Sequence, residues 1–163
     1  MKKILVVVLI IWIVIVFYFS SQPPYQSSVQ SGKVYKFLKE VDNILDFTKT
    51  EWYSKLRFIL EKWWFPEKEP KDLVRKSAHF ILYFILGILA FLFAVSRGQN
   101  TFFSFLLGFS LPTVVAVLDE YNQGFRGRGS SLYDVVIDMN GALFGVFLSL
   151  LVTFLLKILK RKT

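Results

Sequence analysis

Two short polar stretches interrupt a strongly apolar sequence and hold the residue types that bind or transform charged ligands. The stretch "LDEYNQGFRGRGSSLYDVVID", residues 118–138, gathers carboxylates, arginines and a glutamine between two long apolar runs. The stretch "RKSAHF", residues 75–80, contains His79, the single histidine of the chain and therefore its only imidazole for acid–base chemistry. Charged side chains beside membrane-like segments cost free energy unless they are paired with an opposite charge or bind a ligand. Both stretches therefore form the candidate site.

Helical spacing predicts which of these side chains share a face. Arg75, His79 and Tyr83 recur every four residues, so they lie on one face of a helix. A second helical face carries two carboxylates followed by two glycines, at Asp134, Asp138, Gly141 and Gly145. Because glycines let a neighbouring helix approach closely, this second face is predicted to point into a helix bundle.

Asp138 is the strongest single candidate among these residues. It lies more than one turn past the expected helix cap, where an ionised carboxylate is expensive unless it is paired. An acid inside a membrane span therefore indicates function. Its expected partner is an arginine, Arg75 or Arg128, and His79 is a third candidate.

Structural explanations compete with these functional ones. Ser131 and Asp134 have the spacing of a capping box, in which case Asp134 only caps its helix. Arg75 and Lys76 could be membrane-interface anchors, with Lys76 the better candidate, and His79 could be a hydrogen-bonded interfacial residue. For the whole set, the alternative is an ion-pair network that pins the helices together.

Four apolar segments must position these residues, and each approaches the roughly 20 residues that a helix needs to cross a bilayer. They lie at about residues 4–20, 77–96, 101–119 and 134–158. Inside a lipid bilayer, only helices and closed barrels satisfy all of their backbone hydrogen bonds. These segments lack the alternation of apolar and polar residues that barrel strands show. With 54% hydrophobic residues, the chain is predicted to be all-α, an integral membrane four-helix bundle in one domain over residues 1–163.

Antiparallel packing of consecutive spans brings the polar residues to one membrane face. The stretch "RKSAHF" begins the second span, "DEYNQ" ends the third, and "SSLYDVVID" begins the fourth. These three ends therefore lie at the same depth, whichever side of the membrane that is.

The loop between the first and second spans is predicted to be an amphipathic helical surface insertion over about residues 32–65. Apolar residues recur there at spacings of three and four, which indicates helices that lie on the membrane surface or cover the end of the bundle. These residues are Val34, Phe37, Leu38, Val41, Ile44, Leu45, Trp52, Leu56, Ile59, Leu60 and Trp63.

The basic ends "MKK" and "KILKRKT", with Arg97 between the second and third spans, favour cytoplasmic termini. The long loop after the first span is also basic, but long loops translocate largely regardless of charge. "MKK" followed by an apolar run is also typical of a secretory signal. We prefer an uncleaved span, because the following "SSQPPY" lacks a clean small-x-small cleavage site.

Composition excludes several classes of site and partner. The chain has no cysteine, so disulfides and thiolate metal sites are excluded. Its net charge of +8 fits either anionic lipid or nucleic acid, but no basic helix or stacking motif accompanies the charge. Membrane lipid is therefore the predicted partner. No spacing matches a known metal or nucleophile motif closely, so neither a metal nor a cofactor is predicted.

Four motifs together resemble the VanZ-like family: "FSSQ", "RKSAHFILYFILGIL", "LDEYNQGF…GR" and "DVVIDMNGALFG". Their order, spacing and placement on the spans agree with the family, and only about residues 23–71 lie outside the resemblance. Two departures stand out: Asn122 replaces a frequent histidine, and "GFRGR" replaces a longer turn with proline. The resemblance maps the recurrent polar positions of the family to Arg75, Lys76, His79, Tyr83, Asp119, Glu120, Gln123, Arg128, Asp134 and Asp138, with Gly141 and Gly145.

The resemblance implies a small bacterial cell-membrane protein of the envelope, and the founding member of the family is linked to resistance to the glycopeptide teicoplanin. It implies no particular reaction. The leading hypothesis is a site for an anionic, lipid-linked headgroup such as that of a cell-wall precursor. Its phosphate or carboxylate would contact Arg75, Lys76, Arg126 and Arg128. Its neutral parts would bond to Tyr83, Gln123 and Asn140. The residues that orient the cations would be Asp119, Glu120, Asp134 and Asp138.

Two other classes of function remain open. In the first, His79 and Glu120 are catalytic, with the imidazole as general base or nucleophile in phosphoryl or acyl transfer on an envelope lipid. Several carboxylates could then also hold a hard cation such as magnesium. In the second, the protein is structural or binds a partner protein, and changes in the surface loop matter more than changes in the polar residues.

Overall fold

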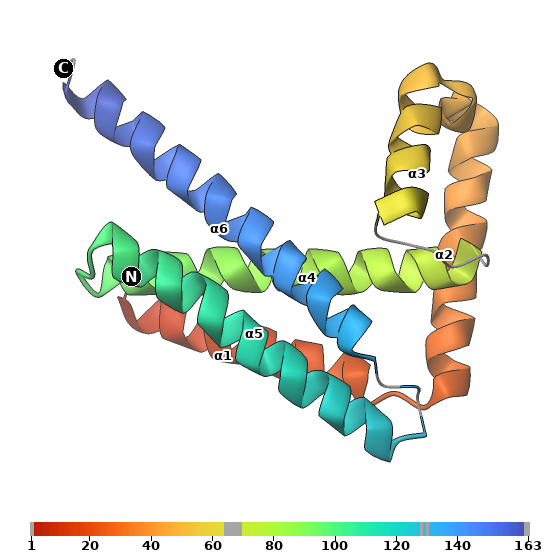
Figure 1. Ribbon diagram of the computed structural model, residues 1–163, viewed down its shortest axis with the longest axis horizontal. Helices are drawn as coiled ribbons and strands as arrows, with labels where there is room; N and C mark the ends of the chain where they lie inside the picture. The colour runs from red at the N-terminus through yellow and green to blue at the C-terminus, as the bar shows by residue number, and fades with distance from the viewer. Residues whose placement is uncertain (1, 64–69, 128, 130, 162–163) are drawn as a thin grey trace. The chain divides into compact units, whose positions relative to one another are not determined.

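The computed structural model describes residues 2–63, 70–127, 129 and 131–161. Its elements in chain order are α1 (Lys2–Ser20), α2 (Pro24–Leu45), the short 3₁₀ helix η1 (Phe47–Lys49), α3 (Glu51–Trp63), α4 (Pro70–Ser96), α5 (Thr101–Phe125) and α6 (Leu132–Arg161) (Figure 1). No strand occurs among these residues, which confirms the all-α prediction.

Four of the helices are long and apolar enough to cross a membrane: α1, Asp72–Ser96 of α4, α5, and Leu132–Lys160 of α6. This confirms the prediction of a multi-pass membrane protein. Helices extend past the predicted spans, most of all where α5 continues to Phe125 and α4 begins at Pro70. Hydropathy marks where lipid contact ends, whereas the helix itself continues through the polar residues until glycine and turn residues stop it.

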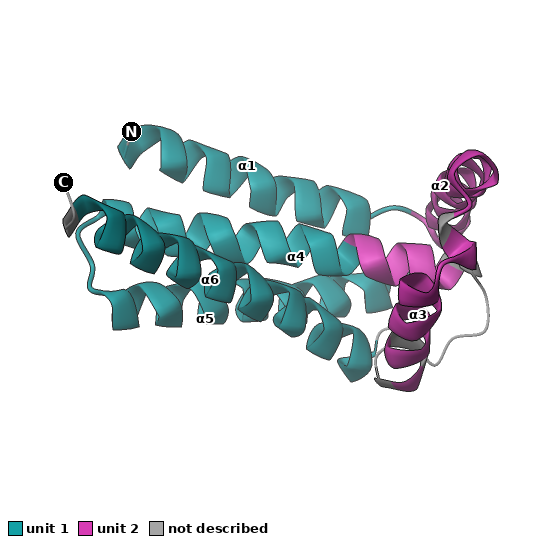
Figure 2. Ribbon diagram, turned by 90° about the horizontal axis from the view of Figure 1, so that it is seen from above, with its two compact units in different colours: residues 1–22, 79–163 teal, residues 23–78 magenta. Residues whose placement is uncertain are grey.

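The chain divides into two compact units (Figure 2). Unit 1 comprises residues 1–22 and 79–163, and unit 2 comprises residues 23–78, so the boundary falls inside α4. In unit 2 the predicted insertion is helical, with α2 and α3 joined through η1. Helix α2 begins earlier than expected because Pro24, which lacks a backbone N–H, is well suited to a first helical turn. Large apolar side chains of α2 and α3 are exposed, among them Phe37, Ile44, Trp52 and Phe58.

Unit 1 contains α1, α5, α6 and the part of α4 from His79 onward, and glycines allow a close helix contact within it. A Cβ atom on Gly141 would meet the carbonyl oxygen of Phe80, and one on Gly145 would meet that of Phe84. The backbones of α4 and α6 are therefore in direct contact, and the glycine face of α6 points inward as predicted. On the opposite side of α4, the Trp12 indole of α1 donates to the Leu82 carbonyl at 2.9 Å.

Candidate functional site

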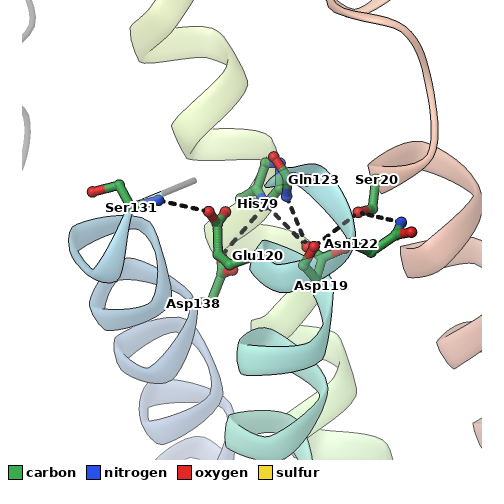
Figure 3. Close-up of polar contacts among 8 residues, drawn as sticks. All are labelled: Ser20, His79, Asp119, Glu120, Asn122, Gln123, Ser131 and Asp138. Atoms are coloured by element: carbon green, nitrogen blue, oxygen red, sulfur yellow. Dashed lines mark hydrogen bonds and ion pairs between the residues drawn. The ribbon is translucent and has the colours of Figure 1, made fainter. Parts of the chain in front are cut away.

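Three helices of unit 1 each place one ionisable side chain in a buried cluster, which we call the His–Asp–Asp cluster: His79, Asp119 and Asp138 (Figure 3). His79 comes from α4, Asp119 from the last turns of α5, and Asp138 from the second turn of α6. Gly141 follows Asp138 by three residues and lies against the α4 backbone, so the helix contact holds the Asp138 carboxylate toward α4.

The imidazole of His79 lies between the two carboxylates. Its Nδ1 atom is 3.6 Å from Oδ1 of Asp138 and 4.0 Å from Oδ2 of Asp119. Both aspartate side chains are 0% exposed. A protonated imidazole would compensate one of these two negative charges, and removing an ionised carboxylate from water is expensive unless it is paired and hydrogen-bonded.

Several buried oxygens in and beside the cluster lack hydrogen bonds. Oδ2 of Asp119 accepts from the Gln123 amide, one turn further along α5, at 3.2 Å. Among the described residues, Oδ1 of Asp119, both carboxylate oxygens of Asp138 and the Tyr83 hydroxyl have no hydrogen-bond partner. Leaving one buried polar group unsatisfied costs about 1–3 kcal/mol. Such groups are rare and call for an explanation, of which an ion or ligand is one.

Glu120 connects the end of α5 to the start of α6. Its Oε2 atom accepts from the Ser131 backbone N–H at 2.9 Å, and the Ser131 hydroxyl accepts from the Tyr133 N–H at 3.1 Å. Ser131 is thus the N-cap of α6, as its sequence position suggested. The spacing of Ser131 and Asp134 predicted a capping box, and the structure gives the N-cap N–H an acceptor outside that pattern, Glu120 of the preceding helix.

Helix α1 adds a polar contact on the other side of α5. The Ser20 hydroxyl donates to the Asp119 carbonyl at 3.4 Å, and the Asn122 amide donates to the hydroxyls of Ser20 at 3.4 Å and Ser21 at 3.1 Å. The sequence reasoning did not propose these residues as part of the site. The sequence could have indicated these contacts, because antiparallel packing places the end of the first span at the same membrane face as "DEYNQ".

Three more predicted residues belong to unit 1: Arg126, Asp134 and Asn140. Arg126 is the C-cap of α5 and is exposed. Asp134 lies half-buried in the first turn of α6. The side-chain amide of Asn140 donates to the Val136 carbonyl at 2.8 Å, which is a bond within α6.

The other three predicted cationic residues fall outside unit 1 or outside the described residues. Arg75 and Lys76 belong to the part of α4 in unit 2. Arg128 lies outside the described residues. The partner that the structure gives Asp138 is His79, the third of the predicted candidates, and the pairing of Asp138 with an arginine stays a prediction.

This arrangement supports two kinds of chemistry. A histidine oriented by carboxylates can act as a general base, and a histidine with two carboxylates can also bind a metal ion. One ligand atom from each member of the His–Asp–Asp cluster lies within 4.8 Å of the others. The sequence predicted no metal because no known spacing is present. A ligand set that comes from three separate helices has no such spacing to detect.

Comparison with known proteins gives one family. The sequence model of the family described as VanZ/LLP1 matches residues 5–155 of the chain. Comparison with curated proteins and with solved structures gives no match.

Proposed function

The chain belongs to the VanZ/LLP1 family, and on that premise we propose that it is a bacterial cell-envelope protein that binds the anionic headgroup of a membrane lipid. A lipid-linked cell-wall precursor has this chemistry. The observation that carries the proposal is the burial of Asp119 and Asp138 with carboxylate oxygens that lack hydrogen bonds in the described part of the chain. Hydroxyl or amide groups of the headgroup that donate to these oxygens would offset their cost.

Each predicted residue has a role in this proposal. Tyr83 and Gln123, both buried, bond to hydroxyl or amide groups of the headgroup. Glu120 holds the α5–α6 turn through Ser131 and so positions the site. Asp134 and Asn140 flank Asp138 on α6 and provide outer contacts. Within unit 1, Arg126 at the end of α5 is the cationic residue proposed to contact the phosphate. For Arg75, Lys76 and Arg128 this role stays a prediction from the sequence.

The test compares a polyprenyl phosphate with the neutral polyprenol of the same length, each added to the purified protein in nanodiscs. We expect the phosphate to raise the melting temperature and the alcohol to leave it unchanged, because only the phosphate offers charge. Tyr83→Phe, which removes one hydroxyl, should weaken binding by about 3- to 10-fold. Tyr121→Phe on the exposed face of α5 is the matched control and should bind like the wild type. Equal binding of alcohol and phosphate would overturn the proposal.

A role in glycopeptide resistance follows as a cellular proposal. Expression in a teicoplanin-susceptible host should raise the inhibitory concentration of teicoplanin. Asp138→Asn, compared at equal abundance in the membrane, should abolish the increase if the headgroup site causes it. Resistance that survives this substitution would separate the phenotype from the site.

A membrane enzyme for phosphoryl or acyl transfer is the second candidate, and the position of His79 favours it. Its Nδ1 atom faces two carboxylates, which would orient the imidazole and stabilise its protonated form. Release of inorganic phosphate from a polyprenyl phosphate or diphosphate, lost in His79→Ala while the lipid still binds, would establish the enzyme. Binding without any turnover would leave the first proposal.

The proposed orientation has both termini in the cytoplasm, which puts the His–Asp–Asp cluster toward the outer face. Reporter fusions at Thr163 and within residues 97–100 should then report the cytoplasm, and a fusion near Thr50 should report the outside. A cytoplasmic signal near Thr50 would invert the topology and move the site to the inner face.

A further inference from the structure

We propose that His79, Asp119 and Asp138 bind one divalent transition-metal ion, of the Mn²⁺ or Zn²⁺ kind, and that the ion bridges the protein to the headgroup phosphate. The bridging step rests on the proposed function, whereas the metal site does not. The ion would be held in the bundle of unit 1, where three helices meet (Figure 3).

The spacing of the ligand atoms suits a single ion. Nδ1 of His79 lies 3.6 Å from Asp138 and 4.0 Å from Asp119, and all three ligand atoms lie within 4.8 Å of one another. Metal–ligand bonds of about 2.0–2.2 Å place neighbouring ligands of a tetrahedral ion about 3.4 Å apart. Small side-chain movements would therefore close the cluster around an ion. The Nδ1–oxygen distances of 3.6 and 4.0 Å are longer than those of an ordinary hydrogen bond.

Asp138 provides the observation that separates this site from an ordinary group of acids. Its side chain is 0% exposed, and neither of its carboxylate oxygens has a hydrogen-bond partner in the described residues. It is aimed into the cluster by the contact of Gly141 with the α4 backbone. Acidic groups at a protein surface are satisfied by water, but this carboxylate is sealed inside the bundle, so a bound cation satisfies it best.

The types of ligand indicate which ion fits. Imidazole favours transition metals such as Zn²⁺, and carboxylates also suit Mn²⁺, so a mixed set disfavours Mg²⁺ and Ca²⁺. The Gln123 amide, which donates to Asp119 Oδ2, makes the kind of outer hydrogen bond that orients ligating carboxylates. Three protein ligands leave coordination positions open for oxygens of a substrate or ligand.

The ion also resolves an electrostatic conflict in the proposed function. Three buried carboxylates lie at the site, those of Asp119, Glu120 and Asp138, beside a single imidazole. A phosphate that approached these carboxylates alone would be repelled. A divalent cation held by two of them attracts the phosphate and completes its own coordination with a phosphate oxygen.

Metal binding is measured on the tag-free, full-length protein in detergent after treatment with a chelator, with Mn²⁺, Zn²⁺ and Mg²⁺ added in separate dialysis experiments. We expect about one Mn²⁺ or Zn²⁺ per chain and weaker binding of Mg²⁺. Asp119→Asn and Asp138→Asn keep the side-chain volume and should each weaken binding about tenfold or more. Glu40→Gln, an exposed acid of α2, is the matched control. Wild-type protein that binds no stoichiometric ion, or both aspartate variants binding normally, overturns the site.

The single histidine permits a test that needs no substitution. Protein produced with isotope-labelled histidine and loaded with Mn²⁺ should show, by pulsed EPR, a nitrogen coupling that changes with the label. Because His79 is the only histidine, this coupling can be assigned to no other residue. A bound ion without histidine coupling would remove His79 from the ligand set and overturn the proposed site as stated.

The two proposals fail in different ways. If the metal binds but the polyprenyl phosphate does not bind the loaded protein, the metal site stands and the headgroup function falls. If the phosphate binds equally well to chelator-treated and metal-loaded protein, the headgroup function stands and the bridging ion is overturned. If phosphate affinity rises with metal loading in the wild type and not in Asp138→Asn, both are supported.

Discussion

Two regions of α5 and α6 bury polar side chains in different ways. Away from the His–Asp–Asp cluster, the buried hydroxyl of Ser104 near the start of α5 donates to the Asn100 carbonyl at 2.9 Å, and that of Ser149 in the middle of α6 donates to the Gly145 carbonyl at 2.9 Å. At the cluster end, both oxygens of Asp138 and one of Asp119 have no hydrogen bond within the described residues. The same pair of helices thus carries satisfied and unsatisfied polar groups.

The difference follows from what a helix offers to its own side chains. A hydroxyl is a donor, and the carbonyl one turn earlier can accept a second hydrogen bond, so a buried serine is satisfied locally. An ionised carboxylate only accepts, and inside a helix every backbone N–H is already used. A buried aspartate must therefore find its donors or cations on another element or on a ligand. The predictions below test this contrast, beginning with the contact on which the whole arrangement depends.

The largest effect is expected at the α4–α6 contact. In Gly145→Ala the new methyl group would collide with the carbonyl oxygen of Phe84, and backbone atoms cannot move aside as a flexible side chain can. We expect a loss of about 3 kcal/mol in the free energy of unfolding, together with loss of ligand binding. Thermal or denaturant unfolding in detergent measures the loss of stability.

The same substitution in open space is the control for the α4–α6 contact. Gly32 lies in α2, where a Cβ atom would meet nothing within 4 Å. Gly32→Ala should stabilise the protein by about 0.5–1 kcal/mol, because alanine is the better helix former. If Gly145→Ala and Gly32→Ala change the free energy of unfolding in the same direction, the close helix contact does not determine the position of Asp138.

A smaller loss is expected when the link between α5 and α6 is removed. Glu120→Ala leaves the Ser131 N–H without its charged acceptor and should cost about 2 kcal/mol. Ser131→Ala removes only the cap to the Tyr133 N–H and should cost about 1 kcal/mol. Both are measured by unfolding in detergent. A Glu120→Ala protein as stable as the wild type would show that α6 begins correctly without this bond.

The same link marks where sequence reasoning stops. The spacing of Ser131 and Asp134 identified the start of α6 correctly, because an N-cap is a local feature. It could not show that Glu120, eleven residues earlier, accepts from the Ser131 N–H. That bond depends on how the turn between the helices folds back, and no local pattern specifies it. Sequence reasoning thus found the helix and missed its actual partner.

The cluster itself was partly predictable. Helical spacing placed His79 and Tyr83 on one face, the glycines oriented Asp138 inward, and antiparallel packing put them at one membrane face. The distances between His79, Asp119 and Asp138 depend on the rotation of three helices about their axes, which hydropathy constrains only coarsely. For this reason the joint position of His79 between both aspartates, and with it the metal geometry, required the structure.

A modest effect on stability is expected at Asp138 when no ligand is present. Asp138→Asn removes one of two carboxylates that face His79, while Asp119 remains within 4.0 Å of the imidazole. The change in unfolding free energy of the cation-free protein should be within about 1 kcal/mol, since lost attraction to the imidazole is offset by relief of repulsion between acids. Asp138→Ala should be less stable than Asp138→Asn, because it also leaves a cavity.

Stabilisation by added Mn²⁺ should be clearly smaller in both Asp138 variants than in the wild type. A purely structural ion pair predicts otherwise, namely a loss of about 3–5 kcal/mol in either variant with no added ligand. Melting curves of the cation-free and Mn²⁺-loaded proteins separate the two cases. A large loss in the cation-free Asp138→Asn protein would assign Asp138 to structure.

The smallest effect is expected at Ser104, at the end of α5 away from the cluster. The Asn100 carbonyl that accepts from the Ser104 hydroxyl also accepts from the Ser104 backbone N–H at 3.0 Å, so Ser104→Ala leaves no acceptor unsatisfied. The change in stability should be within about 0.5 kcal/mol, with metal and lipid binding unchanged, because the hydroxyl was satisfied inside its own helix.

The same substitution at the cluster end should behave differently. Ser20 bridges two helices, since its hydroxyl donates to the Asp119 carbonyl of α5 and accepts from the Asn122 amide. Ser20→Ala should therefore cost about 1 kcal/mol and weaken binding, because the position of Asp119 depends partly on this contact. Paired unfolding and metal-binding measurements on the two variants decide the matter. Equal losses for Ser104→Ala and Ser20→Ala would mean that a buried hydroxyl at either end contributes in the same way. The contrast between locally satisfied and ligand-dependent polar groups would then not describe this bundle.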